Sequence, residues 1–320
     1  MTDLNTFMKL GITELEELSA AEIREGMSQM DLKTLRAWTS KWDAPEKDAP
    51  SVMDAVVNAD VKQSFYLWQE GNMPGVTEYT VNDGDYCDDP DFRPYITSHP
   101  VPAGVTVKGA VVICPGGAFV MRAANIEGEM VARGLAKLGY QCFVVTYRCD
   151  PWTQTERGYD LARAIRFVRK NASKYGFDPK NIAVVGFSAG GILCGETLQN
   201  CSGLVNGTAI DPTYVPDALD NVSADVAAAG MGYSFYGILA HASVDVEKLA
   251  ASHLPPTFYF HGSKEVFYDE ITKHIKAVEA AGIPAERYIL QDQEHGFGGF
   301  VTEWFTVFGD FLNKAFVTDC

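Results

Sequence analysis

The stretch AVVGFSAGG, residues 183–191, decides the fold, because it joins a strand-like run to a helix-like run through a glycine-rich turn. The pattern G-x-S-x-G occupies residues 186–190 and places Ser188 at the centre of the turn. Glycine on both sides removes side chains where strand and helix approach most closely, and allows dihedral angles that other residues avoid. The serine also stands at a helix N-terminus, where backbone N–H groups favour a developing negative charge. The stretch therefore predicts an exposed serine nucleophile on a strand–turn–helix unit.

Two other interpretations of this turn compete with the nucleophile. A dinucleotide-binding turn needs glycine in the pattern G-x-G-x-x-G, and this chain has Ser188 where the second glycine would stand. That departure argues against a nucleotide. A tight turn that happens to contain an ordinary serine remains the simpler alternative, although the strand before it and the helix after it favour the nucleophile.

Strand-like and helix-like runs alternate on both sides of the turn. Apolar helix patterns lie at residues 161–168 and 271–278, and Gly282 fits a C-terminal cap for the second. This alternation predicts an α/β fold with an open, doubly wound, mostly parallel sheet. Ligands of such sheets bind beyond the carboxyl ends of the strands, so chemistry is expected in the loops that follow them. The strand-like runs are residues 76–81, 108–114, 141–147, 181–187, 226–231, 256–261 and 286–290.

The first 75 residues are helical in pattern rather than alternating. Thr13 and Ser19 each precede a glutamate by three residues, which fits a capping box, and Asp31 precedes an apolar series. A further helix is expected at about residues 51–70. We therefore expect a helical N-terminal extension over residues 1–75 and a catalytic domain over residues 76–320.

Composition and charge exclude several classes of protein. The 320 residues are 47% hydrophobic and 21% charged, which suits a large buried core and excludes intrinsic disorder. Lys and Arg number 26 against 42 Asp and Glu, a net charge of −16, so neither a nucleic acid nor an anionic membrane is the expected partner. No apolar run approaches the roughly 20 residues that a membrane helix needs. The acidic balance neither demands nor forbids a homo-oligomer.

Two features point to a cytoplasmic protein. Acidic residues interrupt the first twenty residues, where a secretory peptide would need an apolar run. The seven cysteines are scattered without a C-x-x-C pair, and several lie in apolar strand-like runs, which is typical of reduced, buried thiols.

A second glycine-rich turn, CPGGAF at residues 114–119, directly follows the strand-like run 108–114. A serine that attacks an ester creates an oxyanion, and this charge needs preorganised donors, typically two backbone N–H groups from separate segments. The candidates are Gly117 and Ala118 in this turn and Ala189 beside the serine. Glycines that merely turn the chain are the alternative.

The general base and the acid that orients it are sought in the loops after later strands. His295 follows the run 286–290 and precedes Gly-Phe-Gly-Gly, an exposed position that suits proton transfer. His261 is expected instead to brace its loop through a hydrogen bond. Glu265 is the expected third member, with Asp292 as the second choice and Asp269 interpreted as a helix cap. No metal-ligand spacing occurs, and no cofactor is expected.

These motifs resemble the α/β-hydrolase superfamily, particularly its esterase branch near the hormone-sensitive-lipase and carbohydrate-esterase-like families. The resemblance spans roughly residues 76–320 and implies an α/β-hydrolase fold. It also implies a triad of Ser188, Glu265 and His295, and oxyanion donors at Gly117, Ala118 and Ala189. The motifs that carry it are PGGAF (115–119), Tyr147-Arg148, GFSAGG (186–191), HGSKE (261–265) and EHGFG (294–298).

Two departures from the family pattern affect the site. Ala118 replaces the last glycine of the oxyanion motif, which narrows the space beside the acyl group. Glu265 stands where these families usually have aspartate, and its side chain is one methylene longer.

The expected activity is that of a serine carboxylesterase that hydrolyses short-chain acyl esters, acetyl above all, of sugars or small alcohols through an acyl-enzyme. Residues 201–255, where such folds insert a cap, look short. The alternatives are a peptidase of the same fold, and a non-catalytic scaffold that binds a ligand in the pocket where a catalytic member would bind substrate. Aromatic residues that would wall the substrate pocket are Phe119, Trp152, Tyr233 and Tyr236, although core packing is the commoner role for such residues.

Overall fold

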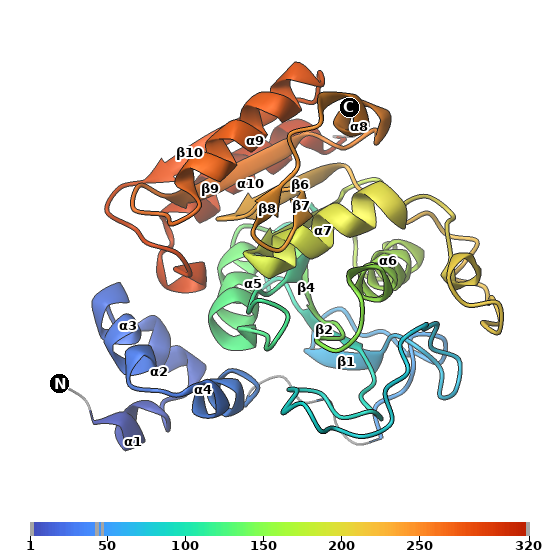
Figure 1. Cartoon of the computed structure of the whole chain (residues 1–320), viewed down its shortest axis with the longest axis horizontal. Helices are drawn as coiled ribbons and strands as arrows, with labels where there is room; N and C mark the ends of the chain where they lie inside the picture. The colour runs from blue at the N-terminus through green and yellow to red at the C-terminus, as the bar shows by residue number, and fades with distance from the viewer. Residues whose placement is uncertain (1–2, 42–44, 46–47, 318–320) are drawn as a thin grey trace.

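A computed structural model describes residues 3–41, 45 and 48–317. Within these residues an eight-stranded sheet runs in the order β1-β2-β4-β3-β5-β6-β9-β10 (Figure 1). Strand β2 is antiparallel to both of its neighbours, and the strands from β4 to β10 are parallel. The strands are β1 (Gln63–Tyr66), β2 (Tyr95–His99), β3 (Gly109–Cys114), β4 (Tyr140–Thr146), β5 (Ile182–Phe187), β6 (Ala228–Gly232), β9 (Thr257–Gly262) and β10 (Ala285–Leu290). The expected doubly wound, mostly parallel sheet is confirmed.

The central strands are buried on both faces because their apolar side chains alternate between two cores. Along β3, Val112 contributes to the core beneath α6, α7 and α9, and its neighbours Val111 and Ile113 contribute to the core beneath α5 and α10. Helices therefore cover both faces of the sheet (Figure 1). The helices are α5 (Met130–Ala136), α6 (Gln154–Lys170), α7 (Ala189–Asn200), α8 (Val246–Ala251), α9 (Tyr268–Ala280) and α10 (Glu303–Ala315).

The N-terminal helices form an arm against the body of the protein, beside α5 (blue in Figure 1). Phe7, Leu15 and Trp38 of the arm share a small core with Ile126 and Met130 of the body. Polar contacts reinforce the docking: Arg133 pairs with Glu16 at 2.8 Å, and Arg36 donates to the carbonyl of Val120 at 2.9 Å. The helices of the arm are α1 (Leu4–Phe7), α2 (Ile12–Glu16), α3 (Ala20–Ser28) and α4 (Leu32–Thr39).

Two predictions of secondary structure are wrong. The helix expected at about residues 51–70 is absent, because its apolar residues serve strand β1, where Phe65 is buried against the sheet. The strand expected at residues 76–81 is also absent, and the backbone N–H groups of Val76 and Thr77 donate to Glu156 of α6 instead of to a neighbouring strand. The antiparallel strand β2 was not foreseen.

Because β1 belongs to the sheet, the sheet crosses the boundary proposed at residue 75, and the division into units 1–75 and 76–320 remains a proposal. Residues 201–255 hold little regular structure above the sheet: a 3-10 turn η2 (Gly207–Ala209), the hairpin β7 (Gly237–Ile238) and β8 (His241–Ala242), and α8. None of the described helices is long and apolar enough to cross a membrane.

Candidate active site

Ser188 occupies the sharp turn between β5 and α7, with φ of 49° and ψ of −121°. The flanking glycines make this turn possible. A Cβ at Gly186 would lie 2.3 Å from the carbonyl oxygen of Gly190, and a Cβ at Gly190 would lie 2.0 Å from that of Cys114. Any side chain at either position would force the backbone apart, so the strained serine depends on both glycines.

The structure brings Ser188, His295 and Glu265 together in one line of hydrogen bonds. Nε2 of His295 lies 2.9 Å from Oγ of Ser188, and Nδ1 lies 2.8 Å from Oε1 of Glu265. The same Oε1 accepts from the backbone N–H of Phe267 at 3.1 Å, which fixes the carboxylate. A carboxylate cannot donate, so Nδ1 carries the proton and Nε2 is left to accept from the serine hydroxyl. This is the tautomer that a general base requires.

The other candidate acids lie elsewhere. Asp292 points into solvent with 83% of its side chain exposed and pairs with Lys264 at 3.0 Å. Asp269 is the second residue of α9 and is not its N-cap, as the sequence had suggested. The N-cap residue is Phe267. Glu265, by contrast, is 5% exposed and contacts the imidazole directly.

His261 braces the end of β9, as expected, but through partners other than Glu265. Its Nδ1 donates to the carbonyl of Gly262 at 2.9 Å, and its Nε2 accepts from Nε of Arg287 at 2.9 Å. Burial lowers the pKa of His261, with the charge of Arg287 acting in the same direction, so the ring is held neutral.

The turn after β3 packs directly against the serine. A Cβ at Gly116 would lie 2.9 Å from Cβ of Ser188, so only glycine allows this approach. The next residues have left-handed backbone conformations, with φ of 131° at Gly117 and 53° at Ala118. Within the described residues, the N–H groups of Gly117, Ala118 and Ala189 have no protein acceptor. Three unpaired donors therefore belong to the two turns that meet at Ser188.

A buried carboxylate that the sequence did not single out joins these turns. Glu127 lies on a π-helical turn, η1 (Ala124–Glu129), and its Oε2 accepts from the N–H of Gly116 at 2.6 Å. Its Oε1 accepts from the hydroxyl of Tyr233, which in turn accepts from the N–H of Gly298 at 3.2 Å. The ring of Tyr233 lies 4.8 Å from that of His295, centroid to centroid. Glu127 thus connects the turn before Gly117 to the loop that carries the histidine.

Burial raises the pKa of Glu127, and the hydrogen bonds from Tyr233 and Gly116 act against that rise. No sequence signal identifies this residue, because its partners stand at positions 116, 233 and 298. Ser234 was missed for the same reason: its Oγ donates to the carbonyl of Ser188 at 2.6 Å and so supports the turn from the β6 side.

Of the four aromatic residues expected to line the pocket, Tyr233 contacts His295, the middle member of the line of hydrogen bonds from Glu265 to Ser188. Phe119 adjoins the turn at Gly117 and packs under the guanidinium of Arg157, 4.3 Å from the ring centroid. The other two have the surroundings of core residues. Trp152 packs edge-on against Tyr79, and Tyr236 is fully buried, with its hydroxyl 2.6 Å from that of Thr257.

Comparisons with known proteins agree with this architecture. The BD-FAE family model matches residues 101–214. Endo-1,4-beta-xylanase B of Butyrivibrio fibrisolvens is 29% identical over 161 residues, which cover 49% of this chain and 23% of that protein. Esterase LipC of Mycobacterium tuberculosis is 30% identical over 200 residues, which cover 62% of this chain and 41% of that protein. The chain thus matches less than half of the length of each of these relatives.

Among solved structures, an acetyl ester-xyloside bifunctional hydrolase from Caldicellulosiruptor lactoaceticus superposes with a TM-score of 0.59 at 22% identity. The match covers 84% of this chain and 98% of that one, so most of this chain shares the fold of that hydrolase. The sheet order, the strained serine turn and these similarities together show that the chain has the α/β-hydrolase fold and is similar to esterases.

Proposed function

We propose that the protein is a serine carboxylesterase in which Ser188 is the nucleophile, His295 the general base and acid, and Glu265 the carboxylate that orients the histidine. The observation that carries the proposal is the unbroken line of hydrogen bonds from Glu265 through His295 to Ser188, at 2.8 and 2.9 Å. The esterase relative LipC supports the same reaction class.

In the proposed mechanism, Oγ of Ser188 attacks the ester carbonyl while Nε2 of His295 takes the hydroxyl proton. Glu265 stabilises the imidazolium through the Nδ1–H hydrogen bond. The carbonyl oxygen becomes an oxyanion, which the unpaired N–H groups of the two turns at Ser188 would bind. When the tetrahedral intermediate collapses, the C–O bond to the alcohol breaks and His295 returns the proton to the departing oxygen.

The second half of the reaction repeats these roles with water. His295 removes a proton from a water molecule, whose oxygen attacks the acyl-enzyme carbonyl. Collapse of the second intermediate breaks the bond to Ser188, which recovers its proton from His295. The products are a carboxylic acid and an alcohol, and the enzyme returns to its starting state.

The substrates that we propose are esters of short acyl groups, acetyl above all, with sugars or small alcohols. Little regular structure covers the sheet between residues 201 and 255, which argues against a deep channel for a long chain. Ala118 and Phe119 belong to the turn that packs against the serine, and Phe119 is only 4% exposed. The Caldicellulosiruptor hydrolase, named for its action on acetyl esters, is in line with this substrate class.

The test combines turnover of an aryl acetate with labelling by a fluorophosphonate probe. Wild-type protein should hydrolyse the acetate and gain one probe mass, and Ser188→Ala should lose both together. Ser173→Ala, at an exposed position after α6, is the matched control and should keep both. Failure of well-folded wild type to react with the probe would favour the non-catalytic scaffold.

A series of aryl esters of increasing acyl length tests the substrate class. Acetyl should give the highest kcat/KM, and faster hydrolysis of long-chain esters would contradict the proposed preference. Faster cleavage of a matched aryl amide would favour the peptidase.

A further inference from the structure

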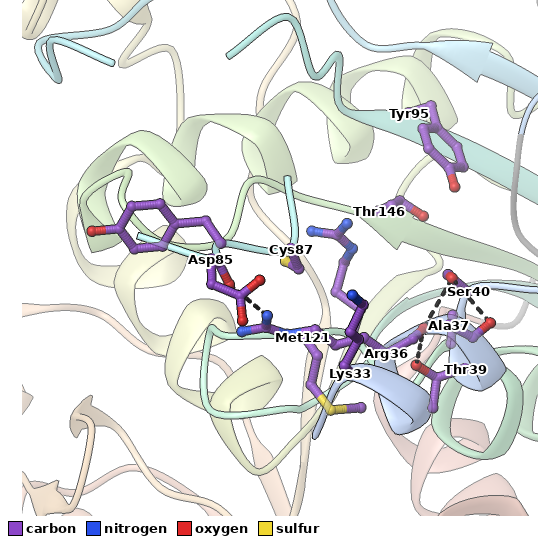
Figure 2. Close-up of a pocket in the computed structure, with 13 residues that line it drawn as sticks. Lys33, Arg36, Ala37, Thr39, Ser40, Asp85, Cys87, Tyr95, Met121 and Thr146 are labelled. Carbon is purple, nitrogen blue, oxygen red and sulfur yellow. Dashed lines mark hydrogen bonds between the residues drawn. The ribbon is translucent and has the colours of Figure 1, made fainter. Parts of the chain in front are cut away.

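A cavity of about 310 Å³ lies beside the loop that carries Gly117, on the side where the N-terminal arm docks. Helix α4 contributes Lys33 and Arg36 to its lining, and the loop before β2 contributes Asp85 and Cys87 (Figure 2). Cys87 is partly exposed and sits among these lining residues. A small solute that enters the cavity therefore reaches its thiol.

A second thiol lies behind the first. The sulfur atoms of Cys87 and Cys149 and a carboxylate oxygen of Asp88 all lie within 4.8 Å of one another. Cys149 follows strand β4 and is fully buried. The hydrogen bond from Cys149 lowers the pKa of Cys87, and the nearby Arg122 acts in the same direction, whereas burial raises the pKa of Cys149. The accessible sulfur is thus the more easily ionised of the two, which is the order needed for an attacking thiol and a resolving thiol.

The charges around the pair favour thiol chemistry over a metal ion. Nη1 of Arg122 lies 2.9 Å from Sγ of Cys149, and the guanidinium binds both carboxylate oxygens of Asp88, at 2.8 and 2.5 Å. The backbone N–H of Cys149 also donates to Asp88, at 2.9 Å. A divalent cation would have to displace the guanidinium from the carboxylate, whereas a thiolate gains from the positive charge that is already in place.

We propose that Cys87 and Cys149 form a peroxide-sensitive pair that closes to a disulfide. The Cys87 thiolate attacks one oxygen of a hydroperoxide, the O–O bond breaks, and the second oxygen leaves with a proton as water or an alcohol. This step leaves a sulfenic acid on Cys87. The sulfur of Cys149 then attacks the sulfenic sulfur, the S–O bond breaks, and water leaves. With hydrogen peroxide, two thiols and one peroxide become one disulfide and two waters.

A disulfide requires the two sulfurs to approach to a bond length of about 2.05 Å. Cys87 lies in a loop without helix or strand between residues 76 and 94, and Cys149 follows β4, so closing the bond requires the loop to move toward Cys149. Cys114 and Cys194 offer an internal comparison: their side chains also contact each other, but both are fully buried. Proximity is shared by the two pairs, and access to a small oxidant distinguishes the first.

The experiment treats the reduced, full-length protein with graded hydrogen peroxide and follows it by intact mass and by a non-reducing peptide map. We expect the loss of two hydrogens per chain, a cross-linked peptide that joins Cys87 to Cys149, and full reversal by a dithiol reductant. Cys149→Ser should trap the sulfenic acid on Cys87, detected with a dimedone probe. At the same dose, Cys114 and Cys194 should remain free.

The wild-type map decides the matter even if a variant fails to fold. Three outcomes would each overturn the proposal. Cys87 could be oxidised without a cross-link to Cys149, or a cross-link could join other cysteines. Both thiols could also stay free at a peroxide dose that oxidises Cys142, a buried residue of β4. Stoichiometric zinc binding that protects both thiols from peroxide would also overturn it, in favour of a metal site.

Discussion

Two buried glutamates approach the candidate active site from different regions of the molecule. Glu265 comes from the loop after β9 and Glu127 from the π-helical turn before α5, and they are 5% and 4% exposed. Glu265 contacts the imidazole of His295, whereas Glu127 contacts the backbone of Gly116 and the hydroxyl of Tyr233. The comparison teaches that equal burial does not imply an equal role, because the role of each carboxylate depends on the groups to which it is hydrogen-bonded. We assign the first to the proton transfer and the second to the position of the donors.

The two carboxylates also differ in how fully they are hydrogen-bonded. Both oxygens of Glu127 accept hydrogen bonds. Oε2 of Glu265 has no hydrogen-bond partner within the described residues, and Oε1 accepts from both His295 and Phe267. A buried acceptor without a partner is destabilising, so Glu265 contributes less to stability than the fully hydrogen-bonded Glu127.

The largest effect is expected from Glu265→Gln, which replaces the carboxylate by an amide of the same shape. The neutral amide cannot stabilise the imidazolium and can impose the wrong tautomer, so kcat/KM for an aryl acetate should fall by about 10³- to 10⁴-fold. Asp292→Asn is the matched control, since Asp292 was the alternative acid, and should leave kcat/KM within about twofold. Equal losses in the two variants would remove Glu265 from its assigned role.

A smaller effect is expected at the second carboxylate. Glu127→Gln and Tyr233→Phe each break the connection between Gly116 and Gly298, so the donors of the Gly117 turn should lose their alignment with the oxyanion. We expect kcat to fall by about 10- to 100-fold with little change in KM, because misalignment is felt in the transition state.

The double variant Glu127→Gln, Tyr233→Phe shows whether the two residues act through one shared connection or through two independent effects on kcat. If the residues act as one unit, the double variant should be hardly slower than the slower single variant, a coupling that a double-mutant cycle measures. Tyr140→Phe, which removes a buried hydroxyl bonded to Gly309, is the control and should keep kcat. Additive losses would mean that Glu127 and Tyr233 act separately.

The smallest effect is a pH dependence of stability that belongs to Glu127. Because burial raises its pKa above the usual 4.5, the folded protein holds a proton there more strongly than the unfolded chain does. This contribution to the free energy of unfolding is fully present below pH 4.5 and is lost as the pH rises through the raised pKa.

The free energy of unfolding of wild type minus that of Glu127→Gln should therefore decrease as the pH rises above 4.5. Urea titrations at a series of pH values measure it, and Glu279→Gln, at an exposed position of α9, should give a flat difference. A difference that grows with pH would show that the folded site prefers the charged carboxylate.

The sequence predicted the parallel strands better than the antiparallel pair β1 and β2. Strands β3 and β5 are continuous apolar runs because both faces are buried, and their pattern was unmistakable. Strands β1 and β2 carry polar residues such as Gln63, Ser64 and Thr97, so their pattern is weak, and β1 was mistaken for a helix. Pairing with a neighbour, rather than local sequence, determines such strands.

The same distinction applies to the candidate site. Ser188, Glu265 and His295 each follow a parallel strand, so chain order and sheet topology together predicted that they meet. Glu127 and Ser234 act through contacts with residues distant in the sequence, and nothing local marks them. Tyr236 was predicted at the pocket because aromatic residues look alike in a sequence, whether they face a ligand or the core.

The backbone at Ser188 has an evolutionary consequence. A positive φ costs a residue other than glycine on the order of 1–3 kcal/mol, and glycine would adopt the same turn at less cost. Selection for stability alone would thus favour glycine at residue 188. The nucleophile role that we propose explains why residue 188 is a serine instead. A descendant that no longer needed a nucleophile could lose the hydroxyl and keep the fold.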